Sequence, residues 1–165
     1  MRLNDGVIAL RRFTEDDVPA ITAACQDPEI PRWTLVPEPY TEEDARVFVR
    51  EFPTAFAVVD AESDALLGAI SLDPAGDGNG QIGYWVAREA RGNGVATRAL
   101  RLLARWGLGQ GGFARVQLLT EPANVASQRV AERAGFTNEG LLRSYAHLKG
   151  RRRDMLMWSL LPTDL

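Results

Sequence analysis

Two glycines at the start of a predicted helix have the spacing that most directly indicates a ligand-binding site. Residues 91–97 read Arg-Gly-Asn-Gly-Val-Ala-Thr and follow an apolar stretch at 81–87. The first backbone amides of a helix have no internal partner and lie at the positive end of its dipole. Glycines at 92 and 94 let an anion approach that backbone, so the pattern predicts a phosphate or pyrophosphate site. A glycine pair before a helix is also a common turn, and this stretch alone does not decide between them.

Two nucleotide-binding patterns compete for this segment, and each fails on named residues. Residues 92–97 depart from the dinucleotide fingerprint G-x-G-x-x-G/A at Thr97, and the region near residue 112 lacks the acidic residue expected about 20 positions on. A phosphate loop of the G-x-x-x-x-G-K-S/T type needs a lysine, which is missing here. The sequence therefore favours an anion site of another kind.

A second predicted helix begins with the polar pattern N-x-x-S, formed by Asn124 and Ser127. Three residues span nearly one helical turn, so the two side chains share one face. Asn124 also suits a helix cap. Two carboxylates, Glu121 and Glu139, are candidate general bases. Each of them has a structural role as its alternative, and an ordered water is a further candidate for the base.

The composition excludes several classes of site. The 165 residues predict a single domain over 1–165, with one cysteine (Cys25) and one histidine (His147). A lone cysteine excludes an internal disulfide, and no cluster of zinc ligands is present, so we expect no metal. No apolar run is long enough for a membrane span or a signal peptide, which predicts a cytoplasmic protein without a membrane partner.

Charge is unevenly divided along the chain. Residues 1–75 carry a net charge of −9 and residues 76–165 a net charge of +6, although the whole chain has only −3. The acidic half owes much of its charge to carboxylates in the first turns of predicted helices, where the dipole favours them. The glycine pair lies in the basic half, which favours an anionic ligand. An isoelectric point near 5.3 disfavours nucleic acid as a partner.

The elements that must position these residues alternate between strands and helices. Thr14 and Thr41 each precede an acid three residues later and predict helix starts. Four prolines in residues 27–40 predict a loop or a broken helix. A helix over 94–110 is long enough to make its two flanking strands parallel. The chain is thus predicted to be α+β with a mixed sheet, and the expected strands are 7–11, 55–60, 65–73, 81–87, 114–121, 136–144 and 153–161.

The hexamer Arg-Gly-Asn-Gly-Val-Ala resembles the R/Q-x-x-G-x-G/A motif of the GCN5-related N-acetyltransferases, the GNAT superfamily. Further likeness to the RimJ/RimL-type branch lies in LRRFTEDDVPAI, GYWV, NVASQRVAERAGFTNEGLLR and GRRRDMLMWSLL, which cover nearly the whole chain in the expected order. The resemblance implies a mixed sheet that splays open between two parallel central strands, flanked by helices. It also implies acetyl-CoA as co-substrate and transfer of its acetyl group to an amine.

The resemblance assigns the cofactor contacts residue by residue. The backbone of a strand segment would pair with the pantetheine, and its last amide would polarise the thioester: Tyr84, Trp85 and Val86. Backbone amides would hold the pyrophosphate after the motif residue Arg91: Gly92, Asn93, Gly94, Val95, Ala96 and Thr97. Asn124 would lie beside the pantetheine. Ser127 would stand as acid at the leaving sulfur, as in the RimL-type pattern.

Two departures from the family pattern keep other functions open. No tyrosine lies in 124–134 to act as acid, and Gln81 stands where many relatives have a glutamate. A CoA-binding sensor or subunit without turnover is therefore the alternative function. The acceptor is a protein N-terminus or a small amine, and a homodimer is compatible with the sequence.

Overall fold

The computed structural model describes residues 1–165 and divides them into two compact units. Unit 1 contains residues 1–71 and 84–99, and unit 2 contains residues 72–83 and 100–165. The single domain over 1–165 stays a prediction.

Unit 1 contains an antiparallel set of strands. Its register places Leu10 opposite Val58 and Phe56 opposite Ile70. The first strand of the set was not predicted, because three residues are too short for a periodic pattern. The strands are β1 (Arg2–Asn4), β2 (Ile8–Arg11), β3 (Ala55–Asp60) and the first part of β4 (Leu66–Pro74).

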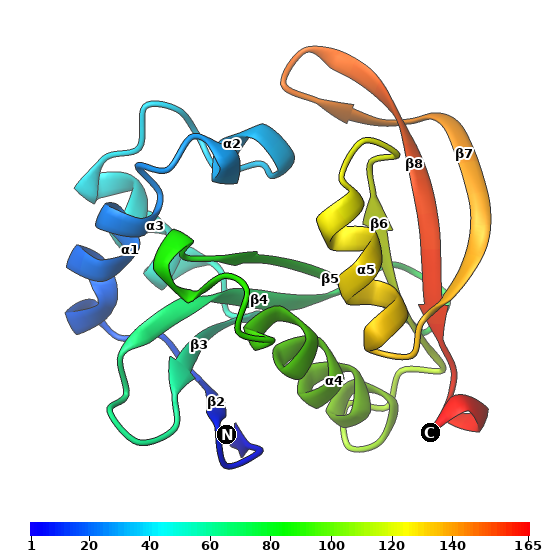
Figure 1. Cartoon of the computed structure of the whole chain (residues 1–165), viewed down its shortest axis with the longest axis horizontal. Coiled ribbons are helices and arrows are strands. Elements are labelled where there is room, and N and C mark those ends of the chain that lie inside the picture. The colour runs from blue at the N-terminus through cyan, green and yellow to red at the C-terminus, as the bar shows by residue number, and fades with distance from the viewer. The chain divides into compact units, whose positions relative to one another are not determined.

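Both predicted helix starts in unit 1 are confirmed. Thr14 and Asp17 form a capping box at the short helix η1 (Glu15–Asp17), which leads into α1 (Val18–Ala24). Thr41 and Asp44 do the same for α3 (Glu42–Glu51), where Thr41 Oγ1 accepts a hydrogen bond from the Asp44 amide. The proline-rich segment between them holds only the five-residue α2 (Glu29–Trp33), a broken helix as predicted. Figure 1 shows α1 and α3 beside each other.

The core of unit 1 forms where these helices meet the indole of Trp85. Trp85 is 8% exposed and packs in one cluster with Val18, Ile21, Cys25 and Tyr40, among others. Burial raises the pKa of the Cys25 thiol to about 12, so this cysteine stays protonated and is no nucleophile.

Unit 2 contains the parallel strand pair. The start of β5 (Asn79–Val86) pairs with β6 (Arg115–Thr120) from Asn79–Arg115 to Ile82–Leu118. β6 pairs on its other side with β8 (Arg151–Leu160), which pairs with β7 (Thr137–Leu148), both antiparallel. A turn at Lys149–Gly150 connects them, and both strands of this hairpin extend closer to it than the predicted strands 136–144 and 153–161 (Figure 1).

A helix follows each of β5 and β6. The two helices are α4 (Val95–Leu108), after the short helix η2 (Arg88–Ala90), and α5 (Val125–Arg133). Gly135 takes φ +93° just after Ala134, the C-cap of α5, which is the usual place for a glycine that ends a helix. A short helix η3 (Pro162–Asp164) ends the chain.

The strand order along the sheet is β1-β2-β3-β4-β5-β6-β8-β7. The pairing of β5 with β6 is parallel, and the other pairs described above are antiparallel. The predicted mixed α+β sheet is therefore confirmed. The last parallel pair is Ile82–Leu118, and β5 continues beyond it to Val86.

Candidate active site

The start of α4 is an open set of backbone donors. Gly92 and Gly94 take φ values of +78° and +74°, a region that favours glycine, and a Cβ added at either would meet nothing within 4 Å. Backbone bonding of the helix begins where the Arg98 amide donates to the Gly94 carbonyl at 3.0 Å. The amides of Val95, Ala96 and Thr97 have no hydrogen-bond partner, and glycine has no side chain to cap them. This geometry fits an anion held by backbone amides.

The last residues of β5 present a backbone edge. Ala87 donates its amide to the Leu67 carbonyl at 2.8 Å, and a Cβ at Gly68 would collide with the Trp85 carbonyl oxygen. These contacts direct the polar groups of Trp85 and Ala87 toward β4. Because backbone groups alternate along a strand, those of Tyr84 and Val86 point to the opposite edge.

Arg91 connects the backbone edge of β5 to the segment at residues 92–94, here called the glycine loop. Its Nε donates to the Val86 carbonyl at 3.1 Å, and its Nη2 lies 2.7 Å from Asp27 Oδ2. Asn93 Nδ2 donates to the Arg91 carbonyl at 3.2 Å. The guanidinium of Arg91 is thus held at two of its nitrogens, one by the Val86 carbonyl and the other by Asp27.

The start of α5 is capped from within. The Ser127 amide donates to Asn124 Oδ1 at 3.2 Å, and the Asn124 amide donates to the Glu121 carbonyl at 2.9 Å. Asn124 and Ser127 are both half-buried. The predicted cap is confirmed, and it uses the oxygen of the Asn124 side chain while its Nδ2 donors take no part.

Both candidate bases are bound by arginines. Arg153 Nη1 lies 2.8 Å from Glu121 Oε2, and both side chains of this pair are largely buried. Glu139 Oε2 accepts from Arg115 Nη1 at 2.7 Å and from the Ser159 hydroxyl at 2.8 Å. The Arg115 and Ser159 hydrogen bonds lower the pKa of Glu139. A general base works best with a pKa near the working pH, so these contacts oppose that role for Glu139.

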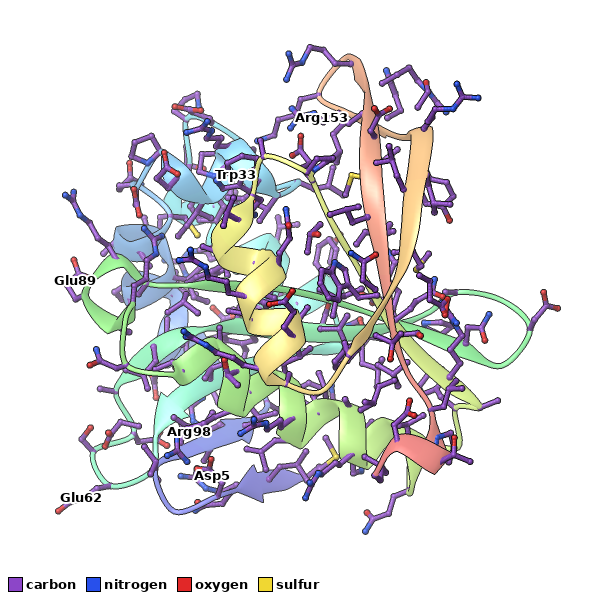
Figure 2. The ribbon with its side chains drawn as sticks, turned by 45° about the vertical axis from the view of Figure 1, so that its right-hand side comes forward. Asp5, Trp33, Glu62, Glu89, Arg98 and Arg153 are labelled. Carbon is purple, nitrogen blue, oxygen red and sulfur yellow. The ribbon has the colours of Figure 1, made fainter.

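Two arginines of α4 are also engaged. Arg98 Nη1 lies 2.8 Å from Asp5 Oδ2, and Figure 2 shows these two side chains pointing toward each other. Arg101 donates to the carbonyl of Arg133, the last residue of α5. Both arginines are therefore held by contacts within the protein.

The predicted residues divide between the two units. Residues 84–86 and 91–97 lie in unit 1, where Arg91 brings the two segments together; Glu121, Asn124, Ser127 and Glu139 lie in unit 2. Sequence reasoning missed Asp27 and the partner of Glu121, Arg153. Each forms an ion pair with a residue far away in the chain, so no local spacing could have indicated it.

A family model decides the identity of the chain. Residues 8–137 match the model described as acetyltransferase (GNAT) domain. The chain belongs to the GNAT acetyltransferase family. A relative from Bacillus licheniformis, the uncharacterized N-acetyltransferase p20, is 28% identical over 168 residues, covering 95% of this chain and 94% of the relative. The predicted enzyme class, an N-acetyltransferase, is confirmed at this level.

Solved structures confirm the GNAT fold. An acetyltransferase of the GNAT family from Bacillus anthracis has a TM-score of 0.90 at 22% identity, with 98% of each chain covered. RimL, a ribosomal L7/L12 alpha-N-protein acetyltransferase solved in complex with coenzyme A, has a TM-score of 0.81 at 21% identity, again with 98% of each chain covered. No helix of the present chain is both long and apolar enough to cross a membrane.

Proposed function

We propose that the chain is a single-domain, acetyl-CoA-dependent N-acetyltransferase that modifies a primary amine by direct attack of that amine on the thioester. The observation that carries this proposal is the open start of α4, tied through Arg91 to the backbone edge of β5. Acetyl-CoA supplies the acetyl group as its thioester. The residues of this chain bind it, orient it and handle the proton.

Two backbone segments bind different parts of acetyl-CoA. The amides of residues 92–97 hold the pyrophosphate, and the edge at Tyr84 and Val86 pairs with the pantetheine. Because the Val86 carbonyl already accepts from Arg91, the amide of the same residue is the group left to polarise the thioester carbonyl. Losing a donor of this kind costs roughly 3 kcal/mol in enzymes where it has been measured. Asn124 contributes Nδ2, since its oxygen caps α5.

The amine must be neutral before it attacks. An α-amine has a pKa of about 8 and a lysine side chain about 10.4, so an α-amine needs less help at neutral pH. Glu121 and Glu139 are held by Arg153 and Arg115, and we therefore assign proton removal to an ordered water. As the C–S bond breaks, the Ser127 hydroxyl passes a proton to the leaving sulfur and regains one from the ordered water, so the proton removed from the amine ends on the CoA thiol.

The acceptor we favour is the α-amine of a protein N-terminus. The lower pKa of α-amines supports it, and so does the similar fold of RimL, an alpha-N-protein acetyltransferase. A cytoplasmic location follows from such an acceptor. A small-molecule amine is the second acceptor class, and a CoA-binding sensor without turnover is the second function.

An acceptor screen tests this function directly. The whole protein is incubated with acetyl-CoA and three acceptors: a peptide with a free α-amine, the same peptide with a blocked N-terminus and one lysine, and a mixture of small amines. We expect mass spectrometry to find one added acetyl group on the first peptide. Acetylation of small amines alone would reassign the acceptor. Binding of CoA with no thiol release above background for any amine would favour the sensor.

A further inference from the structure

Asp27 lies outside every motif, yet it contacts the glycine loop. It follows α1 in the proline-rich segment of unit 1, and its side chain is only 10% exposed. Its Oδ2 is buried without a well-aligned hydrogen bond, and the partner of this oxygen is the guanidinium of Arg91, whose Nη2 is 2.7 Å away. A buried carboxylate that depends on one arginine holds that arginine in place.

The same carboxylate also holds the start of α2. Asp27 Oδ1 accepts a hydrogen bond from the Glu29 amide at 3.2 Å, and the Ile30 amide donates to the Asp27 carbonyl at 3.1 Å. Ile30 is 2% exposed and belongs to the core cluster of unit 1, which anchors this segment. One side chain therefore joins the α2 turn to Arg91, and Arg91 in turn joins the Val86 carbonyl.

We propose that Asp27 is a positioning residue of the cofactor loop, which orients Arg91 so that its Nε fixes the end of β5 and the loop start together. This inference rests on the proposed binding of CoA at residues 84–97. It also gives the motif arginine a different task from binding phosphate, because its charge is already matched by Asp27. Asp27 thereby links cofactor binding to the α2 segment.

Electrostatics alone predicts the opposite effect of Asp27 on CoA. A carboxylate beside an anion site repels the anion, so its removal would leave the Arg91 charge uncompensated and tighten binding. Positioning predicts weaker binding when Asp27 is neutralised. The sign of the change in CoA affinity therefore distinguishes the electrostatic effect from the positioning effect. A double-mutant cycle with R91Q isolates the contribution of the Asp27–Arg91 pair. Glutamine satisfies the R/Q position of the motif without needing a counter-charge.

The experiment measures the affinity of CoA by titration calorimetry for the whole protein and for D27N, R91Q and the double variant. We expect D27N to weaken CoA binding about tenfold in the wild-type background, within the usual range of coupling between contacting residues. In the R91Q background we expect D27N to leave the affinity unchanged or to improve it. Tighter or unchanged binding by D27N alone, or an equal loss in both backgrounds, would overturn the proposal.

D17N is the matched control for loss of a buried carboxylate. Asp17 also lies in unit 1, is 6% exposed and pairs with Arg11 at 2.8 Å, but it has no contact with the glycine loop. We expect D17N to lower thermal stability and keep the CoA affinity of the wild type. If D17N weakens CoA binding as much as D27N, the effect of D27N is general destabilisation and the proposal fails.

Hydrogen exchange gives a readout that needs no turnover and no stable double variant. In the free wild-type protein, the hydrogen-bonded amides of Ala87, Ala90 and Arg91 in one segment and of Ile30 and Arg32 in the other are expected to exchange slowly as one unit, with both segments exchanging about tenfold faster in D27N. Faster exchange in only one segment would contradict the link. If the wild type binds no CoA at all, the proposed function fails, whereas CoA binding that D27N does not weaken removes only the role of Asp27.

Discussion

Helices α4 and α5 both follow a strand of the sheet, but they begin in opposite ways. α5 starts on Asn124, whose side chain accepts from the Ser127 amide, and the Glu121 carbonyl holds the Asn124 amide. α4 starts on Gly94, which has no side chain, and its amides at Val95, Ala96 and Thr97 have no partner. The start of α5 is therefore capped by a side chain of the protein, whereas the first amides of α4 are left without a partner in the protein.

This difference separates a structural helix start from a binding one. An uncapped helix start is costly unless water or a ligand satisfies its amides, since a good cap contributes about 1 kcal/mol. The positive φ angles at Gly92 and Gly94 add a conformation that other residues adopt at a cost. Keeping both features at α4 has a clear purpose if an anion binds there.

The largest expected effect comes from closing the open helix start. G94A places a methyl group in the free space and strains a φ of +74°, so we expect CoA affinity to fall about 100-fold by calorimetry. G112A carries nearly the same strain at φ +73°, also with free space, but lies in the loop before β6. We expect G112A to lose stability alone. Equal CoA affinity in the two variants would remove the distinction between the helix starts.

A smaller effect is expected at Asn124, where two substitutions distinguish its role as the cap of α5 from its contact with CoA. N124S keeps a capping oxygen and loses the amide donors, whereas N124A loses both. We expect both variants to bind CoA about tenfold more weakly, while only N124A loses about 1 kcal/mol of unfolding free energy in urea titrations. Normal CoA affinity in N124S would show that α5 begins with a purely structural cap.

Ser127 tests whether the capped helix takes part in chemistry. S127A keeps the backbone amide that bonds to Asn124, so stability should stay within about 0.5 kcal/mol. We expect kcat with the identified acceptor to fall about fivefold, the scale of one hydrogen bond, with little change in the KM of acetyl-CoA. Unchanged turnover would remove the acid role.

The smallest effect concerns Glu139. The Arg115 guanidinium and Ser159 hydroxyl lower its pKa, so the ionised carboxylate stabilises the fold above its ordinary pKa of about 4.3. This stability is lost as pH falls through the lowered folded value. We expect E139Q to lose about 0.5 kcal/mol at neutral pH, because the pair is partly exposed, and nothing at strongly acidic pH. Its pH–rate profile should match that of the wild type; loss of the acidic limb, where a general base becomes protonated, would restore Glu139 as base.

Much of the fold could be predicted because its signals are local. Thr14 and Thr41 each form the capping box that their spacing with an acid predicts. The crossover helix required β5 and β6 to be parallel, and they are. The short β1 escaped prediction because it is stabilised only by pairing with β2.

The candidate site could be predicted only in part. Glycine positions and the N-x-x-S pattern are visible in the sequence, since they act through backbone geometry nearby. The partners of Arg91, Glu121 and Glu139 are not visible, because each lies far away in the chain and is brought close by the fold. Those contacts change the roles we assign. The two candidate bases are paired with arginines, and we propose that Arg91 is positioned by Asp27.

The central claim is that the open start of α4 binds the pyrophosphate of CoA. The most direct measurement is an amide NMR titration of the isotopically labelled protein with CoA. The account predicts that the largest shift changes fall on Gly94, Val95, Ala96 and Thr97, with the internally bonded Ser127 amide changing less. Saturable CoA binding that leaves the amides of residues 92–97 unshifted would contradict it.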